Sequence, residues 1–244
     1  MNTKGLPARS EALLALLRAA GADRLSSFEL LPRIAIELTM RHISGVSDPL
    51  QQPYPWYVLC ELSSGATEGL DELLEKILGQ ALASSLIQDA ALATSERVRL
   101  AFWRLRETVP EAQRHEGLSI KHDISVPVAS LPNFIDEASR WVGDNVPDGL
   151  LVCYGHAGDG NLHFNICCAD RKHNEAFLAR ESSIHRAIHD LVAHYRGSIS
   201  AEHGIGRLKR EELQRYSSPV ALATMHAIKH ALDPNGIMNP GKVL

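Results

Sequence analysis

Two histidines, His156 and His163, lie on either side of a glycine-rich turn and are the residues of this sequence best suited to chemistry. Imidazole is a common ligand for zinc, iron and manganese, so a pair across a tight turn can converge on one ion. From position 161 to 166 polar and apolar residues alternate, which in a strand places His163 and Asn165 on one face. Ordinary histidines in a loop hydrogen-bond the backbone instead, but the glycines of the turn allow close approach to a ligand and favour an ion site.

A carboxylate and an imidazole stand side by side at Glu202 and His203, in a segment that continues with two glycines. Neighbouring side chains in extended backbone point to opposite sides, so Glu202 can face the ion of the histidine pair while His203 faces elsewhere. Two imidazoles and one carboxylate leave a coordination position open, as a catalytic metal requires. The segment fits a second interpretation equally well, in which Glu202 lies near a helix N-terminus and interacts with its dipole.

Arg106 and Lys121 are candidates for binding a substrate carboxylate, because a guanidinium and an ammonium can hold its oxygens jointly. Two basic residues of this kind are more commonly solvated surface. The histidines at 185, 189 and 194 lack the neighbouring glutamate of a metalloprotease helix, so we expect them at the surface or partly buried. The glycine-rich turn does not follow G-x-G-x-x-G, so neither a dinucleotide fold of that type nor a P-loop is indicated.

Hydrophobic spacing predicts a mixture of helices and strands without the regular strand–helix alternation of a parallel sheet. The order favours the α+β class, with an antiparallel sheet and helices packed on one face. A composition shift near residues 217–219 separates a main body, 1–217, from a C-terminal helical arm, 218–244. The predicted helices are 8–22, 30–43, 67–82, 95–109, 131–142, 174–195, 206–214 and 220–232, and the predicted strands are 53–62, 119–126, 149–154 and 161–168.

The composition of the 244 residues is that of an ordinary globular protein, with 45% hydrophobic and 22% charged residues. The net charge of −4 gives no reason to expect nucleic acid or an acidic membrane as a partner. No run of about 20 apolar residues is present, so we expect no membrane span. Four cysteines occur without a C-x-x-C pair, which favours small buried thiols in a reducing cytoplasm over disulfides.

Four segments follow one another in a specific order: residues 121–127, 155–165, 202–206 and 233–242. Together they resemble the C-terminal domain of FAD-linked oxidases of the vanillyl-alcohol-oxidase type, and Ser27-Phe28-Glu29 is similar to that family's first characteristic segment. The family includes D-lactate dehydrogenases, D-2-hydroxyglutarate dehydrogenases and the D subunit of glycolate oxidase. The resemblance covers nearly the whole chain and implies a ferredoxin-like cap domain.

The resemblance also implies roles for individual residues. The expected ligands of a divalent metal, zinc first and manganese or iron as alternatives, are His156, His163 and Glu202. The substrate is expected to be a small 2-hydroxy acid, contacted by Asn165 and held through its carboxylate by Arg106 and Lys121. His203 is expected to take the proton of the substrate hydroxyl, which agrees with the suitability of imidazole as a base near neutral pH.

In the family, the α-hydrogen of the substrate leaves as hydride to FAD, which is bound by a domain that precedes this region. No such domain is recognised here, so we expect a piece of a longer protein or a separate subunit, with the FAD-binding domain in cis or in trans. The chain alone is then expected to be inactive. Pro110 stands where hydroxyglutarate-type enzymes have a hydroxyl residue, although Thr108 is close by, which leaves recognition of a second carboxylate open.

Two alternatives follow from the same residues. The chain can be a non-catalytic module that binds a metal and a hydroxy acid, or an inactive fragment that lacks the flavin domain. The arm 218–244 would in the leading interpretation pack on the FAD-binding domain. A homodimer in the cytoplasm is a further expectation.

Overall fold

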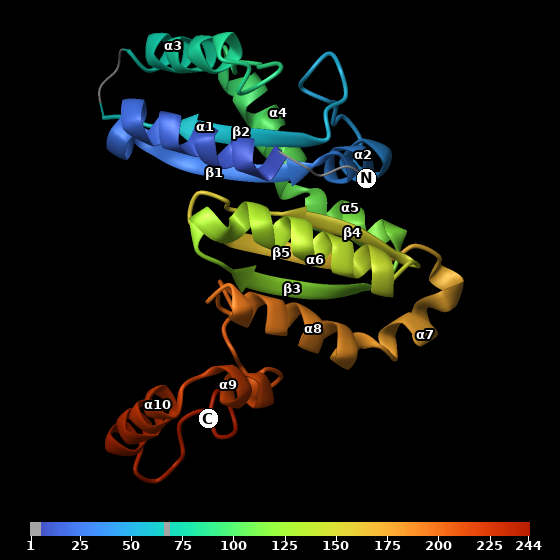
Figure 1. The fold of residues 1–244 in the computed structure, drawn as a ribbon, viewed down its shortest axis with the longest axis vertical. Coiled ribbons are helices and arrows are strands. Elements are labelled where there is room, and N and C mark those ends of the chain that lie inside the picture. The colour runs from blue at the N-terminus through green and yellow to red at the C-terminus, as the bar shows by residue number, and fades with distance from the viewer. Residues whose placement is uncertain (1–5, 66–68) are drawn as a thin grey trace.

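The computed structural model describes residues 6–65 and 69–244, in which helices surround two small antiparallel sheets (Figure 1). This arrangement confirms the α+β class. Short 3-10 turns lie at Ala22–Arg24, Val128–Ser130 and Arg171–His173. The strands are β1 (Leu25–Pro32), β2 (Trp56–Leu62), β3 (Ser119–Ser125), β4 (Gly149–Tyr154) and β5 (Asn161–Cys168). The helices are α1 (Leu6–Gly21), α2 (Arg33–His42), α3 (Leu70–Ala83), α4 (Glu96–Glu107), α5 (Val109–Glu116), α6 (Leu131–Asn145), α7 (Asn174–Leu178), α8 (Glu181–His194), α9 (Arg210–Tyr216) and α10 (Pro219–Leu232).

The two sheets meet at one corner. In the larger sheet the strand order is β3-β5-β4, all neighbours are antiparallel, and Asp123 and Tyr154 both stand opposite His163. The smaller sheet consists of β1 paired antiparallel with β2. Leu30 and Gly155 exchange two backbone hydrogen bonds of 2.9 and 3.1 Å. Strand β1 is therefore anchored directly beside the residue that precedes His156.

The larger sheet has a dry face and a polar face. Helices α6 and α8 cover the dry face, as predicted for a sheet with helices packed on one face. Helices α2 and α5 cover only part of the polar face. Because side chains alternate along β5, residues 162, 164 and 166 enter the core, and residues 161, 163 and 165 face the other side. The buried apolar residues between the sheet and helices α6 and α8 include Ile120, Ile124, Leu162, Phe164, Ile166, Phe134, Ile135, Ile184 and Ile188.

Strand β1 occupies positions at which the apolar spacing predicted the start of a helix. The helix predicted from residue 30 to 43 begins only at Arg33, as α2, and the residues before it are extended. The reason is Pro32, because a residue that precedes a proline is disfavoured in the helical conformation. Leu31 therefore stays extended and pairs with Tyr57 of β2.

Two other predicted helices are divided. The helix predicted at 95–109 ends at Glu107, and α5 follows with Pro110 in its first turn, where a proline is tolerated because that N–H has no helical partner. The helix predicted at 174–195 is interrupted at Ala179 and Arg180, where Arg180 binds the carboxylate of Asp148. The strands predicted at 149–154 and 161–168 have the observed bounds, and the remaining predicted elements are present with shifted ends. The start predicted at residue 67 lies outside the described residues.

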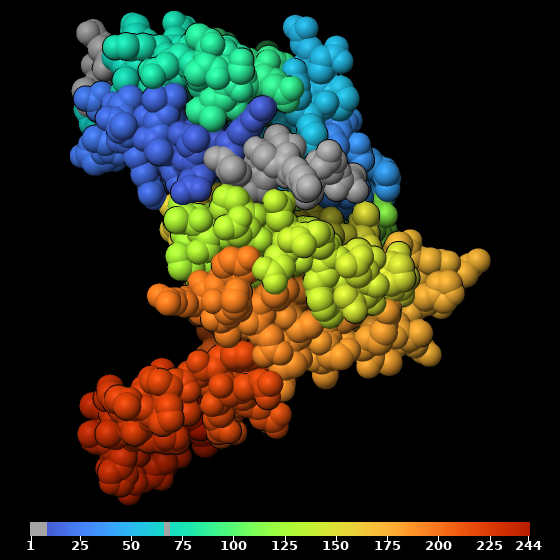
Figure 2. All heavy atoms as spheres, viewed as in Figure 1, coloured from blue at the N-terminus to red at the C-terminus, as the bar shows by residue number. Residues whose placement is uncertain are grey.

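The C-terminal helices stand apart from the body of the molecule (Figures 1 and 2). Glu212 of α9 connects them to α8 through Arg186 and His189. Beyond α9 the surface is rich in exposed large apolar side chains, among them Val220, Ile228, Leu232, Ile237 and Met238. The boundary predicted at 217/218 falls between α9 and α10 and stays a prediction.

Two smaller expectations concern cysteines and membranes. Within the described residues the four cysteines are free, and Cys153, Cys167 and Cys168 are buried, as expected for small apolar side chains. Among the same residues, no helix combines the length and the apolar character needed to cross a bilayer.

Candidate metal centre

The connection between β4 and β5 places His156 and His163 near each other, and it requires glycine at its two ends. Gly155 has φ +149° and Gly160 has φ +88°. A Cβ atom at Gly160 would lie 2.0 Å from the carbonyl oxygen of Val126, and one at Gly155 would lie 2.8 Å from the oxygen of Asn161. The glycine-rich composition noticed in the sequence therefore has a structural reason, which is the close approach of this turn to the neighbouring backbone.

The segment that carries Glu202 and His203 is fixed by Asp123 of β3. Its buried carboxylate accepts hydrogen bonds from the backbone N–H groups of Glu202 (2.9 Å) and His203 (2.8 Å). The N–H of Ala201 donates to the carbonyl of Asp123. Burial alone would raise the pKa of Asp123, but the backbone N–H groups of His203 and Glu202 outweigh it, and the pKa is lowered.

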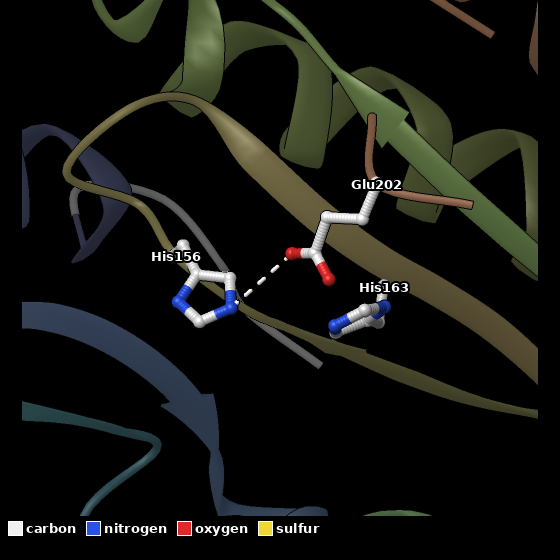
Figure 3. A group of neighbouring side chains, drawn as sticks. All are labelled: His156, His163 and Glu202. Atoms are coloured by element: carbon white, nitrogen blue, oxygen red, sulfur yellow. Dashed lines mark ion pairs between the residues drawn. The ribbon is translucent and has the colours of Figure 1, made fainter. Parts of the chain in front are cut away.

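His156, His163 and Glu202 converge from these two segments (Figure 3). One ligand atom from each of the three side chains lies within 4.8 Å of the other two. The closest approach is 3.2 Å, between His156 Nε2 and Glu202 Oε1. The structure therefore brings together the three residues that the sequence singled out as metal ligands, in an arrangement that three bonds of about 2 Å to a common centre can span.

The protonation of His156 tests whether this group suits a cation. Nδ1 of His156 contacts the carboxylate of Glu29, which can only accept a hydrogen bond, so Nδ1 carries the proton. The other ring nitrogen, Nε2, lies 3.2 Å from Glu202 Oε1, where it can donate a hydrogen bond as an imidazolium or offer a lone pair to a metal as a neutral ring. Imidazole nitrogen and carboxylate oxygen are both common ligands of divalent transition metals. The donor set therefore fits a divalent metal.

His163 is held in the neutral form that a metal requires. Burial lowers the pKa of His163, and the positive charge of Arg106 lowers it further. Its ring lies 5.0 Å from that of Tyr154 and 6.3 Å from that of His203, measured between centroids. Burial also raises the pKa of Tyr154 to about 12, so its hydroxyl stays protonated near neutral pH.

The candidate substrate-binding side chains surround the same face of the sheet. Arg106, at the end of α4, is buried, lies over the ring of Tyr154 and donates from Nε to Glu29 Oε2 at 2.7 Å. Asn165 is buried and donates to Gln113 Oε1 at 3.1 Å. Lys121 is exposed and stands opposite Asn165 in the β3–β5 ladder. All three therefore border the His163 side of the sheet.

His203 lies at the rim of this group. Its side chain is 69% exposed, and Nδ1 lies 3.5 Å from Asp123 Oδ2. It is thus accessible to a small molecule while its backbone is fixed by the same carboxylate. Glu202 thus lies with the two candidate metal ligands, whereas the side chain of His203 lies beside Asp123 and is open to solvent.

Two carboxylates of the site were missed as functional residues by the sequence interpretation. Glu29 and Asp123 both lay in segments that carry the family resemblance, 27–29 and 121–127, but neither was given a role. Glu29 interrupts an apolar run between Phe28 and Leu30, Asp123 lies beside Ile124 in the predicted strand, and both are buried. A charged residue inside a predicted strand is the signal that could have found them, because buried charges are costly unless paired.

One histidine of a second group was misjudged. His189, expected at the surface or partly buried, is 2% exposed and lies beside His185 and the buried His122. The sequence could not show this, because the group forms only when α8 packs on β3. His194 is exposed, as expected.

Comparison with known families now gives the family. Residues 5–243 match the model of the family described as FAD linked oxidases, C-terminal domain. The chain belongs to this family. The resemblance seen in the sequence motifs is thereby confirmed.

Curated relatives carry the name D-2-hydroxyglutarate dehydrogenase. The chain is 39% identical over 234 residues to a probable mitochondrial D-2-hydroxyglutarate dehydrogenase of Oryza sativa subsp. indica, covering 95% of this chain and 40% of that protein. It is 36% identical over 198 residues to the D-2-hydroxyglutarate dehydrogenase of Stutzerimonas stutzeri, covering 81% of this chain and 42% of that protein. The chain thus spans about 40% of the length of these relatives.

Solved structures support the fold. A crystal structure of p-cresol methylhydroxylase with substrate bound matches 97% of this chain and 50% of its own chain with a TM-score of 0.65, at 14% identity. A 4-ethylphenol oxidase from Gulosibacter chungangensis matches all of this chain and 51% of its own, with a TM-score of 0.59 at 16% identity. At such identities the likeness concerns the fold alone.

Proposed function

We propose that the chain is the substrate- and metal-binding part of an FAD-dependent dehydrogenase that oxidises a D-2-hydroxy acid to the 2-oxo acid. The observation that carries the proposal is the convergence of His156, His163 and Glu202 beside the buried guanidinium of Arg106. Membership of the FAD-linked oxidase family and the names of the relatives favour the same reaction class.

The metal is proposed to be zinc, with manganese or iron as alternatives. Two imidazoles and a carboxylate are a donor set common to catalytic zinc and to other divalent ions. When bound, such an ion supplies Lewis acidity that stabilises negative charge developing on a substrate oxygen. The contribution of the protein is to orient His156 through Glu29, to favour the neutral form of His163 by burial, and to present the Glu202 carboxylate.

The organic substrate is proposed to lie between this centre and three polar side chains. The terminal nitrogens of Arg106, together with Lys121, are suited to the carboxylate common to all 2-hydroxy acids. Asn165 is held by Gln113 on the same face and is proposed to contact the hydroxy-acid head. His203, exposed and adjacent to Glu202, is proposed to accept the hydroxyl proton. FAD, bound by a partner domain, would accept the hydride.

The substrate class is proposed only as far as the 2-hydroxy acid. The relatives are named for D-2-hydroxyglutarate, which has a second carboxylate. In this chain Pro110 offers no donor, and the hydroxyl of Thr108 donates to the carbonyl of Arg104 at 2.8 Å. Recognition of a second carboxylate by this turn is therefore weakened, and D-lactate and D-2-hydroxyglutarate should both be tested.

The FAD-binding domain is proposed as the partner of the C-terminal arm, in cis or in trans. The arm, residues 218–244, carries exposed apolar side chains such as Val220, Leu232 and Ile237, and exposed apolar surface of this kind is typical of a binding interface. The homodimer and the cytoplasmic location stay predictions.

Elemental analysis of the purified, metal-reloaded chain tests the proposal. We expect about one equivalent of a divalent transition metal per chain, and less than about a tenth of an equivalent would contradict the three-ligand site. Calorimetry with D-lactate and D-2-hydroxyglutarate, with and without metal, then tests substrate binding. Turnover of a dye acceptor by the chain combined with its flavin domain separates an enzyme from a non-catalytic binding module.

A further inference from the structure

The carboxylate of Glu29 lies between the metal group and the candidate substrate-binding arginine. Glu29 is 1% exposed. Its Oε1 contacts Nδ1 of His156, and its Oε2 accepts a hydrogen bond of 2.7 Å from Nε of Arg106. One buried side chain therefore touches a candidate metal ligand and a candidate substrate ligand at the same time.

The backbone fixes this bridge from both sides. Leu30, the next residue of β1, exchanges two hydrogen bonds with Gly155, the residue before His156. The N–H of Gly158 donates to the carbonyl of Phe28 at 3.2 Å, on the other side of Glu29. Strand β1 and the β4–β5 turn are thus held in register where the two side chains meet, and the contact does not depend on a flexible surface loop.

The chemistry of the bridge sets the free atoms of both partners. A carboxylate only accepts hydrogen bonds, so it holds the His156 proton on Nδ1 and leaves Nε2 for the metal group. It engages Arg106 through Nε, and within the described residues the two terminal nitrogens of Arg106 make no recorded hydrogen bond. Those nitrogens form the side of a guanidinium that binds a carboxylate in bidentate fashion.

We propose that Glu29 is a positioning residue that sets the affinity of the metal centre through His156 and orients Arg106 toward the substrate carboxylate. This inference rests on the proposed function. Because Glu29 contacts both His156 and Arg106, it would hold the metal and the carboxylate of the substrate at a fixed separation.

A simpler role for Glu29 is to neutralise the buried charge of Arg106. The two roles differ in what they predict for the metal. A charge partner of Arg106 affects folding stability and leaves metal affinity unchanged when it is replaced. A positioning residue changes metal affinity, because a carboxylate that orients a ligating imidazole commonly contributes 10- to 100-fold, on the order of magnitude seen in other metal sites.

The test is a calorimetric titration of the chain with Zn²⁺ and, separately, Mn²⁺. In Glu29→Gln one acceptor oxygen becomes an NH₂ group, so the side chain can no longer accept from both His156 and Arg106. We expect metal affinity to fall about 10- to 100-fold relative to the wild type. The matched control is Glu61→Gln in β2, because Glu61 also accepts hydrogen bonds from two donors, Trp103 and Arg99, and contacts none of the three candidate ligands. Its metal affinity should equal that of the wild type.

A double variant covers the case in which Glu29→Gln alone does not fold. Glu29→Ala combined with Arg106→Met leaves neither a buried unpaired guanidinium nor an acceptor for Nδ1 of His156, and it should show the same loss of metal affinity.

Nitrogen NMR of the imidazoles gives a readout that a purely structural role would not change. In the metal-free wild type the His156 signals, assigned by comparison with His156→Ala, should report a proton on Nδ1. In Glu29→Gln that preference should weaken.

The outcomes separate the inference from the proposed function. If the wild type and His163→Ala both fail to bind metal, the proposed function and the inference fall together. If the wild type binds metal, His163→Ala does not, and Glu29→Gln binds as tightly as the wild type with unchanged His156 signals, the inference is overturned and the proposed function stands.

Discussion

Two groups of histidines lie on opposite faces of the same sheet, and only one of them has the geometry of a metal centre. His163 of β5 belongs to the first group, and Phe164, the next residue, borders the second. Likewise Asp123 of β3 faces the candidate metal centre, whereas His122 faces α8. The alternation of strand side chains thus separates two imidazole groups that are neighbours in sequence.

The second group, which we call the buried histidine cluster, consists of His122, His185 and His189. Their ring centroids lie 4.6, 5.6 and 5.8 Å apart. His122 Nδ1 is bonded to the carbonyl of Phe164 at 2.7 Å, and His189 Nδ1 contacts Glu212 at the same distance. Within the described part of the chain, one ring nitrogen of each histidine is buried without a hydrogen-bond partner.

The two groups differ in how their ligand atoms are arranged. In the first group one ligand atom each of His156, His163 and Glu202 lies within 4.8 Å of the other two, and the described residues of the buried histidine cluster form no such group. The cluster is instead exposed to the positive charge of Lys209, which helps to lower the pKa of each ring. The buried histidine cluster also has carboxylates beside it, Glu212 at His189 and Glu181 at His185, so what sets the first group apart is that one ligand atom of each residue lies close to the other two.

The largest expected contrast is in metal content. His163→Ala should reduce bound metal from about one equivalent to less than a tenth, whereas His185→Ala should leave it unchanged. At a free metal concentration of 100 times the dissociation constant, the wild type should gain about 2.7 kcal/mol in free energy of unfolding, and His163→Ala should gain none. Elemental analysis and urea unfolding measure both effects. Equal loss of metal in His163→Ala and His185→Ala would contradict the assignment of the metal site to the first group of histidines.

The next contrast concerns anion binding beside the metal centre. Arg106→Met should weaken binding of a D-2-hydroxy acid to the metal-loaded chain by about 1.5–3 kcal/mol, because a charge-assisted hydrogen bond to the carboxylate is lost. Calorimetry with D-lactate and with D-2-hydroxyglutarate measures it. Arg99→Met is the control on the same helix, since Arg99 pairs with Glu96 and Glu61 instead. Equal weakening in both variants would argue against a specific role of Arg106.

Adjacent residues of β3 provide a third contrast. Asp123→Asn removes the charge that holds the N–H groups of Glu202 and His203, so the free energy of unfolding should fall by about 1.5–3 kcal/mol and metal affinity should fall with it. His122→Phe changes the opposite face and should leave metal affinity unchanged. Urea unfolding and metal titration of both variants test this. A loss of metal affinity in His122→Phe would show that the two faces are not independent.

The smallest contrast is a pH dependence of stability that belongs to the buried histidine cluster. Burial lowers the pKa of His122, and also of His185 and His189, below the ordinary value of 6.5. As the pH falls through 6.5 the unfolded chain therefore binds more protons than the folded chain, and stability is lost. Urea unfolding of the metal-free chain between about pH 7 and pH 5 should show this decline, with a shallower slope in His122→Phe. A constant or rising stability over that range would contradict it.

Local patterns in the sequence predicted the strands of the site well. The alternation at 161–168 and the apolar run at 149–154 gave the bounds of β5 and β4, because one face of each strand is buried and the period of two is visible in the residues. The convergence of Glu202 with the two histidines was expected from residue types and from the family resemblance. The helical interpretation also fitted Glu202, and the spacing alone did not decide between them.

Contacts between distant segments escaped the sequence. The last residues of strand β1, 30–32, were taken for the start of a helix because Leu30 and Leu31 also fit helical spacing. The partner strand β2 lies beyond helix α2 in the sequence. The position of Glu29 between His156 and Arg106 depends on that pairing and on the contact between Leu30 and Gly155. The burial of His189 depends in the same way on how α8 packs against β3. Such contacts arise from tertiary packing, which has no periodic signature in the chain.

The most direct test of the metal centre is a crystal of the chain soaked in Zn²⁺ and measured at the zinc absorption edge. We expect the strongest anomalous peak about 2.0–2.2 Å from a nitrogen of His156, a nitrogen of His163 and a carboxylate oxygen of Glu202. A map with no peak among these three side chains, or with its strongest peak in the buried histidine cluster, would contradict the account.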